Sequence, residues 1–320
     1  MTETPTPRLQ HFPIAWFAMI MGLGGLTLAW SRAEDLLGLP LSLSPYLLAL
    51  STLLFLALAL VYALKAIKYR AAVAVEWNHP IKMSFLPTFS IALIILAIGW
   101  LSVSVTYSKW LWTVGSVLHL LLTLHIITQW MHQTKFEIVH LNPAWFIPVV
   151  GNILVPIAGV QHAPPEVSWF FFSIGIVFWP VLLAIIFYRV IFHGSLPERL
   201  LPTLFILIAP PAVGFLAYLR LTGAIDAFAL VLYFSGLFFT VLLLAQLPWF
   251  LRIRFFLSWW AYSFPLAAIT LATLAMYHHT GSSLFLALSG VLLGITSAVV
   301  VGLFVRTVIA VARREICLQE

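Results

Sequence analysis

Ten histidines are the residues of this sequence best suited to bind a metal ion or a haem iron. His119 and His125 share one apolar segment, but six residues turn a helix by about 600°, so the two rings point to different faces. His278 and His279 are adjacent and also diverge. Because no zinc-type spacing is present, we expect structural or interfacial histidines, no metal site and no cofactor. A haem protein with paired histidines on facing helices stays open as an alternative.

Carboxylates, which proton relays and cation sites within membranes need, are absent from the long apolar segments. The ten acidic residues lie in tails, loops or helix ends: Glu3, Glu34, Asp35, Glu76, Glu137, Glu166, Glu198, Asp226, Glu315 and Glu320. A pathway without fixed charge is a poor cation site, whereas basic residues at its mouth raise the local anion concentration. This pattern favours an anion pathway.

Composition indicates the class of protein. The chain has 320 residues, of which 62% are hydrophobic and 8% charged, against about 45–50% and about 25% in soluble domains. The solvent for such a chain is lipid, and windows of about 20 apolar residues, enough to cross a bilayer, fill most of it. No room is left for a soluble catalytic domain, so we predict that the chain is not an enzyme. Cys317 is the only cysteine, which excludes an internal disulfide.

Apolar runs and turn signals predict one transmembrane domain over 1–320 with ten helical spans. The spans are 12–31, 43–66, 84–106, 110–132, 143–161, 167–192, 200–221, 224–247, 255–277 and 282–312. Residues 1–10 carry no basic cluster, so the first span is read as a retained helix and not as a signal peptide.

Prolines distinguish the odd-numbered spans from the even-numbered ones. They lie inside odd spans at Pro87, Pro148, Pro156, Pro210, Pro211 and Pro265, and well inside an even span only at Pro180. A proline leaves a backbone carbonyl without its donor, which is tolerated only against protein or water. The even spans are Leu-rich rods suited to face lipid. Isolated proline kinks also occur in helical bundles that have no pathway. The recurrence of kinks on alternate helices favours a central pathway lined by the odd helices.

The odd spans start at 12, 84, 143, 200 and 255, at intervals of 72, 59, 57 and 55 residues. This near-repeat predicts an all-α membrane fold of five helical hairpins in a quasi-fivefold ring. In this arrangement the odd helices lie inside and line a pore, and the even helices lie outside.

Asn152 and Phe264 are two residues within spans for which two roles are open. The Asn152 amide either lines a pathway or forms a hydrogen bond between helices. Phe264 directly precedes the kink residue Pro265 in the run WWAYSFPLA, so its ring lies at depth. It either has a packing role, facing lipid or the core, or lines a pathway.

Basic residues predict the orientation. If the N-terminus is cytoplasmic, only Arg32, Lys109 and Arg220 of the sixteen lysines and arginines lie on the outer side. The positive-inside rule therefore places both termini in the cytoplasm of a multi-pass protein of the cell inner (plasma) membrane.

Six segments together resemble the tellurite-resistance/dicarboxylate transporter family, which includes TehA-like proteins and plant slow-type anion channels. They are LTLAW at 26–30, EWNHPIKMSF at 76–85, NPAWFIPVVGN at 142–152, WPVLL at 179–183, IAPPAV at 208–213 and WWAYSFPLA at 259–267. They occur in family order along essentially the whole chain. The chain departs from the family at Ile20, where TehA-like members have a proline, and at Trp179, where they have a carboxylate.

The resemblance implies a homotrimer with one pore in each protomer, occluded by a phenylalanine that matches Phe264. It also makes Ala18 a pore-lining candidate, beside the candidate lining or kink residues Pro87, Pro148, Asn152, Pro210 and Pro265. The predicted function is a passive channel for small monovalent anions such as chloride and nitrate. The alternatives are a secondary transporter of dicarboxylates or tellurite-type oxyanions and, from another class, a membrane enzyme. Expected partners are small inorganic anions and the lipid bilayer, and not nucleic acid.

Overall fold

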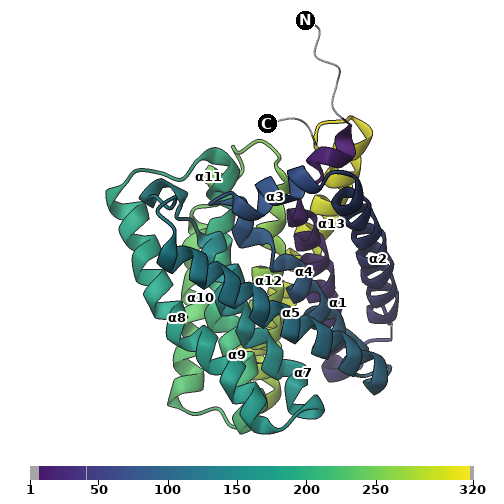
Figure 1. Cartoon of the computed structure of the whole chain (residues 1–320). Coiled ribbons are helices and arrows are strands. Elements are labelled where there is room, and N and C mark those ends of the chain that lie inside the picture. The colour runs from purple at the N-terminus through teal and green to yellow at the C-terminus, as the bar shows by residue number, and fades with distance from the viewer. Residues whose placement is uncertain (1–6, 41, 318–320) are drawn as a thin grey trace, which may run out of the picture.

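The computed structural model describes residues 7–40 and 42–317. Both ends of the predicted 1–320 domain, with Glu3 and Glu320, lie outside the described residues. The described part is all-helical, without strands (Figure 1), which confirms the predicted fold class. It contains ten helices long and apolar enough to cross a membrane: Ile14–Leu37, Ser44–Lys68, Lys82–Trp100, Val105–His132, Pro143–His162, Pro165–Phe192, Glu198–Thr222, Ala227–Ala245, Leu257–Thr280 and Ser283–Ala312. We call these the first to tenth spans.

The largest shifts in span boundaries come from turns and caps that hydropathy does not detect. The first span runs past its predicted end at 31 to Leu37, where Gly38 adopts a left-handed φ of 59°. The third span, predicted to reach 106, ends at Trp100. The eighth begins at Ala227 because Asp226 caps it, accepting a hydrogen bond from Ala229 N at 2.9 Å. The Tyr218 hydroxyl also donates to Asp226 (2.5 Å), and these bonds lower the pKa of the Asp226 carboxyl.

Each even span is one continuous α-helix. These helices are α2 (Ser44–Lys68), α5 (Val105–His132), α8 (Pro165–Phe192), α10 (Ala227–Ala245) and α13 (Ser283–Ala312). Helix α8 continues through Pro180.

Each odd span changes from 3-10 helix to α-helix along its length. The first span joins η2 (Ile14–Phe17) to α1 (Ala18–Leu37), and the third span joins η3 (Lys82–Phe85) to α4 (Thr88–Trp100). The fifth span alternates twice, through η5 (Pro143–Trp145), α6 (Phe146–Val150), η6 (Gly151–Leu154) and α7 (Val155–His162). The seventh span joins η7 (Glu198–Ile208) to α9 (Ala209–Thr222), and the ninth span joins η8 (Leu257–Tyr262) to α12 (Ser263–Thr280). Runs of 3-10 helix longer than three or four residues are uncommon, so the 11 residues of η7 are unusual. Prolines lie at or near four of the changes, whereas the first span changes without one inside it.

Short helices outside the spans were not predicted from the sequence. They are η1 (Arg8–His11), α3 (Arg70–Asn78), η4 (Ile138–His140) and α11 (Leu247–Phe250). Helix α3 follows α2 directly and lies at the same end of the protein as α11 (Figure 1). Arg8 Nη2 donates to Ile316 O at 3.0 Å, so the first and last described segments meet at one end.

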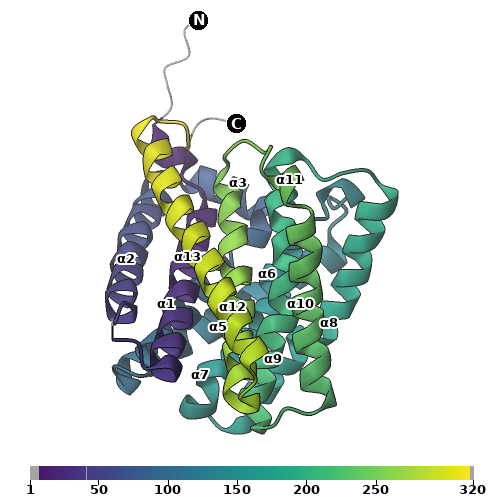
Figure 2. The same ribbon diagram turned by 180° about the vertical axis from the view of Figure 1, so that it is seen from behind.

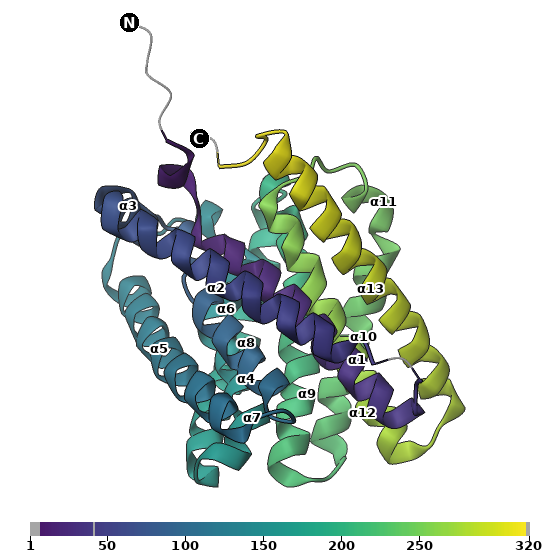
Figure 3. The ribbon, with the colours of Figure 1, turned by 90° about the vertical axis from the view of Figure 1, so that its right-hand side faces the viewer.

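Burial alternates along the chain. In the apolar part of each span, between 72% and 83% of residues are buried in the odd spans, against 22% to 39% in the even ones. Figures 1 and 2 show α2 and α8 at opposite edges with α12 between them, and Figure 3 shows α5 and α13 at the other two edges. The odd spans therefore supply most of the protein core.

The odd spans contact one another in sequence. Helix α1 contacts α4, α4 contacts α7, α7 contacts α9, α9 contacts α12, and α12 contacts α1. Each odd span also packs against the even span that follows it. Small residues permit the closest of these approaches: a Cβ added at Gly22 of α1 would lie 2.7 Å from Ser263 Cβ and 3.0 Å from Trp260 Cε3.

Gly22→Ala is expected to lower the free energy of unfolding by about 1–3 kcal/mol, because the added methyl group overpacks the contact between α1 and the ninth span. The matched control is Gly294→Ala in the middle of α13, where no atom of the chain lies within 4 Å of the added carbon. That change is expected to be neutral or to stabilise by up to about 1 kcal/mol, the helix-propensity difference. Thermal or denaturant unfolding in detergent measures both, and equal effects would contradict the close packing.

Candidate functional site

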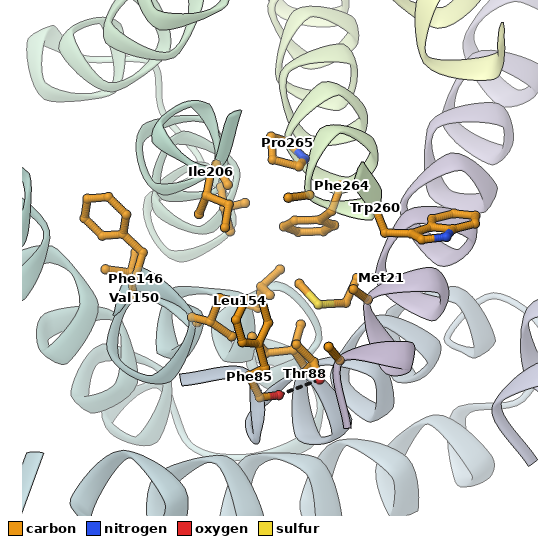
Figure 4. Close-up of a pocket in the computed structure, with 18 of the residues that line it drawn as sticks. Met21, Phe85, Thr88, Phe146, Val150, Leu154, Ile206, Trp260, Phe264 and Pro265 are labelled. Atoms are coloured by element: carbon orange, nitrogen blue, oxygen red, sulfur yellow. Dashed lines mark hydrogen bonds between the residues drawn. The ribbon is translucent and has the colours of Figure 1, made fainter. Parts of the chain in front are cut away.

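A cavity of about 80 Å³ lies between the odd spans (Figure 4). Its lining comprises Ala15, Ala18 and Met21 of the first span, Phe85, Thr88 and Ile91 of the third, Phe146, Ile147, Val150, Gly151 and Leu154 of the fifth, Ile206, Ala209, Pro210 and Val213 of the seventh, and Leu257, Ser258, Trp260, Ala261, Phe264 and Pro265 of the ninth. All five odd spans contribute, and none of these residues belongs to an even span. The cavity lies where the spans change from 3-10 to α-helix.

The cavity wall is apolar and carries no charged side chain. Its two hydroxyl side chains, Thr88 and Ser258, are already engaged with backbone carbonyls. Thr88 Oγ1 donates to Phe85 O at 2.6 Å, and Ser258 Oγ donates to Arg199 O at 2.5 Å. Their hydroxyl protons are therefore not available to an anion, and the wall has a weak electrostatic field.

Phe264 lies in the first turn of α12 and is 9% exposed. Figure 4 shows its ring projecting from α12 into the space between Ile206 and Met21. A Cβ added at Gly25 would lie 3.3 Å from Phe264 Cδ2, so the ring packs against the bare backbone of the first span. Phe264 thus fills part of the volume that the five spans enclose.

The other predicted site residues divide into two groups. Ala18, Pro210 and Pro265 line the cavity with Phe264, whereas Pro87, Pro148 and Asn152 do not. The carbonyl of Pro87 accepts from Ile91 N at 2.9 Å, and that of Pro148 accepts from Thr123 Oγ1 at 2.6 Å. These two prolines lie at irregular points of their spans while their carbonyls remain satisfied.

Asn152 is fully buried and points toward the fourth span. Its amide donates to Thr123 Oγ1 of α5 at 3.0 Å and to Val149 O at 2.8 Å. Of its two open roles, this geometry gives Asn152 the hydrogen bond between helices.

His119 is the buried histidine nearest to the cavity wall. Its Nδ1 lies 2.9 Å from Ser90 Oγ, and its ring packs behind Gly151. His278 and His279 lie at the exposed end of α12 with their ring centroids 5.3 Å apart. Among the described residues, no group of three or more His, Cys, Asp or Glu side chains is placed to hold a metal ion.

Sequence reasoning missed most of the cavity wall, including Met21, Phe85, Leu154 and Ile206. Apolar residues facing a cavity do not differ in type from those in the core. The available signal was the proline near four of the five changes of helix type, which locates the level of the cavity without identifying the inward-facing residues.

A family model described as voltage-dependent anion channel (SLAC1) matches residues 11–308. The chain belongs to this family. It is 31% identical to the S-type anion channel SLAH3 of Arabidopsis thaliana over 95% of the chain and 49% of the relative, and 27% identical to the guard cell S-type anion channel SLAC1 of the same plant over 96% and 57%. It is also 27% identical to the tellurite resistance protein TehA homolog of Haemophilus influenzae over 83% of the chain and 81% of the relative.

The family membership confirms the predicted resemblance. The chain spans about half the length of SLAH3, so the plant protein contains further segments. The family consists of channels and transporters rather than enzymes, in agreement with the prediction. Together with the ten apolar spans, it makes the chain a multi-pass membrane protein.

Asn152→Ala and Thr123→Val are each expected to lower the free energy of unfolding by about 1–3 kcal/mol, because each leaves a buried polar partner unsatisfied. The double variant should lose less than the sum, since the two side chains share one hydrogen bond. Unfolding transitions of the four proteins measure this coupling. Thr113→Val is the control, because Thr113 is exposed and donates only to Lys109 O of its own helix. Fully additive losses would show that the two residues act independently.

Proposed function

We propose that this protein is a passive channel for small monovalent anions such as chloride and nitrate. The observation that carries the proposal is the apolar cavity, to which all five odd spans contribute and which Phe264 partly fills. The plant relatives are named anion channels, which supports the choice of substrate class.

The proposed architecture is a quasi-fivefold ring of helical hairpins. Contacts between successive odd spans and between the first and the ninth support a closed inner ring. The lower burial of the even spans supports their position outside, against lipid. Non-ideal backbone is tolerated within a membrane only against protein or a water-filled cavity, which agrees with 3-10 segments confined to the inner spans.

Weak field strength and basic mouths account for anion preference in this proposal. Arg199, Arg252 and Arg254 lie at or before the starts of the seventh and ninth spans, where positive charge raises the local anion concentration. An anion that enters the cavity loses hydration and gains little interaction energy from the apolar wall. Weakly hydrated anions, which lose the least, should therefore pass best.

The cellular setting belongs to the same proposal. The excess of basic residues at one end supports cytoplasmic termini in the inner (plasma) membrane. A homotrimer with one pathway in each protomer rests on the family resemblance alone.

The alternative is a secondary transporter of dicarboxylates or tellurite-type oxyanions. The name of the Haemophilus relative and that of an uncharacterized transporter of Methanocaldococcus jannaschii, 26% identical over 84% of the chain and 86% of the relative, favour it. Coupled transport normally uses an ionisable group at membrane depth. The described acidic residues instead lie outside the spans or near their ends, which supports the channel.

Phe264→Ala is expected to raise basal anion conductance by about 10- to 100-fold. Displacing a buried large apolar side chain costs about 1.5–3 kcal/mol, and about 1.4 kcal/mol corresponds to a factor of ten. Planar-bilayer or liposome flux recordings measure the change, and Phe264→Leu should have a smaller effect.

The matched control for Phe264 is Phe215→Ala in α9, a fully buried phenylalanine that does not line the cavity. It should lose about 3–5 kcal/mol of stability without a gain in current. If Phe264→Ala also loses stability while its conductance stays low, Phe264 is a packing residue and the gate assignment is wrong.

Passive conduction predicts that the reversal potential of the Phe264→Ala current follows the anion gradient alone, because no carboxylate is available at membrane depth to couple a second ion. Recordings with imposed chloride, proton and sodium gradients test this. A shift in reversal potential when only the proton or sodium gradient changes would reject the channel in favour of the transporter.

A further inference from the structure

The start of the first span is held by a buried charged cluster outside the cavity. Lys65, at the end of α2, and Glu76, on α3, form an ion pair with Nζ to Oε2 at 2.9 Å, and their side chains are only 4% and 5% exposed. The Tyr62 hydroxyl donates to Glu76 Oε2 at 3.0 Å. A buried ion pair persists only where its remaining donors and acceptors are also satisfied, and here the backbone of the first span satisfies them.

Glu76 caps the first 3-10 turn of that span. Helix η2 follows Pro13, whose side chain offers no cap. Ile14 N donates instead to Glu76 Oε1 at 2.6 Å, across 62 residues of sequence. Lys65 Nζ donates to Phe12 O at 2.8 Å on the other side of Pro13. The pair therefore holds the backbone both before and after this proline.

The fixed turn determines which side chains face the cavity. In a 3-10 helix, residues three apart lie on one face, and Ala15 and Ala18 line the cavity at this spacing. Their neighbours Ile14, Trp16 and Phe17 are large and buried away from it, at 4%, 6% and 0% exposure. A rotation of η2 would replace a methyl group with a large side chain at the wall.

The same turn contacts the neighbouring third span of the wall. Thr88 Oγ1, a cavity residue of the third span, lies 3.3 Å from Ile14 O. Ile14 thus bonds to Glu76 through its N–H, and its carbonyl lies beside Thr88, so the residue that Glu76 caps also packs against the third span.

We propose that Lys65 and Glu76 are positioning residues of the pathway, which hold η2 in the rotation that presents Ala15 and Ala18 to the cavity and thereby keep it wide enough to conduct. The proposal deepens the proposed function and rests on it. Helix α3 does not span the membrane, and the proposal gives it a role: it carries Glu76, the cap of the first span.

Glu76→Gln tests the cap, since the amide keeps the shape but loses the charge. The Gln carbonyl can still accept from Ile14 N, so the change replaces a charge-assisted hydrogen bond by a neutral one, which corresponds to a factor of about 5 to 10 in the local opening equilibrium. Amide hydrogen exchange of the peptide containing Ile14 to Ala18 should therefore accelerate by that factor. In the Phe264→Ala background, the unitary anion conductance should fall, because large side chains turn toward the cavity.

Two further variants keep the test decisive if Glu76→Gln folds poorly. The double variant Lys65→Met with Glu76→Leu leaves no unpaired buried charge and should show the same faster exchange and lower conductance. The charge swap Lys65→Glu with Glu76→Lys retains an ion pair, but Lys at 76 cannot accept from Ile14 N, so it should not restore conductance. Lys65→Arg keeps the positive charge, so it should retain both the slow amide exchange and the unitary conductance. The control is Glu315→Gln, which breaks the exposed Arg306–Glu315 pair at the same end and should change neither.

The outcomes separate the two proposals. Recovery by the charge swap, or faster exchange with unchanged unitary conductance, would overturn the positioning role. No anion current in the Phe264→Ala parent would overturn the proposed function and the effect on conductance with it, whereas the exchange rates would still show whether the pair holds the first span.

Discussion

The arrangement of this protein depends on one constraint: within a bilayer, backbone donors and acceptors must be satisfied by the protein itself. A continuous α-helix meets that condition alone unless a proline interrupts it, and the five even spans are continuous α-helices with one proline well inside, Pro180 of α8. The odd spans contain 3-10 segments and prolines, and a proline within a helix leaves the carbonyl four residues earlier without its donor. Side chains of other helices supply donors to this irregular backbone, as the bond from Thr123 Oγ1 to Pro148 O illustrates. Such spans are tolerated when other helices surround them, and their higher burial follows from this.

The irregular backbone also forms the cavity. A change from 3-10 to α-helix alters the angular spacing of successive side chains around the axis, and the cavity lies where five such changes meet. Small residues such as Ala15, Ala18 and Gly151 line the space, and larger side chains of the ninth span, above all Phe264, fill part of it. The wall is apolar, and the charged side chains of the described residues lie near or beyond the ends of the spans.

The charged residues act at those ends. The Lys65–Glu76 pair is buried at the start of the first span, and it supplies the cap that Pro13 does not provide. Neither residue touches the cavity, yet the pair fixes the turn that carries two of the lining residues. Charges just outside the membrane core can therefore determine the shape of an apolar site within it.

The sequence by itself determined the membrane class, the ten spans, the concentration of prolines in odd spans, and the absence of acidic residues at depth. These properties follow from residue type and period, which act locally. It also indicated Pro210 and Pro265, because kinks mark the level of the cavity, and the family resemblance indicated Ala18 and Phe264. The tertiary structure alone decided that Asn152 bonds to Thr123, that Met21, Leu154 and Ile206 face the cavity, and that Glu76 caps Ile14. The direction in which an apolar or polar side chain points at a given level depends on the rotation of its helix, and that rotation is fixed by contacts between residues far apart in the chain.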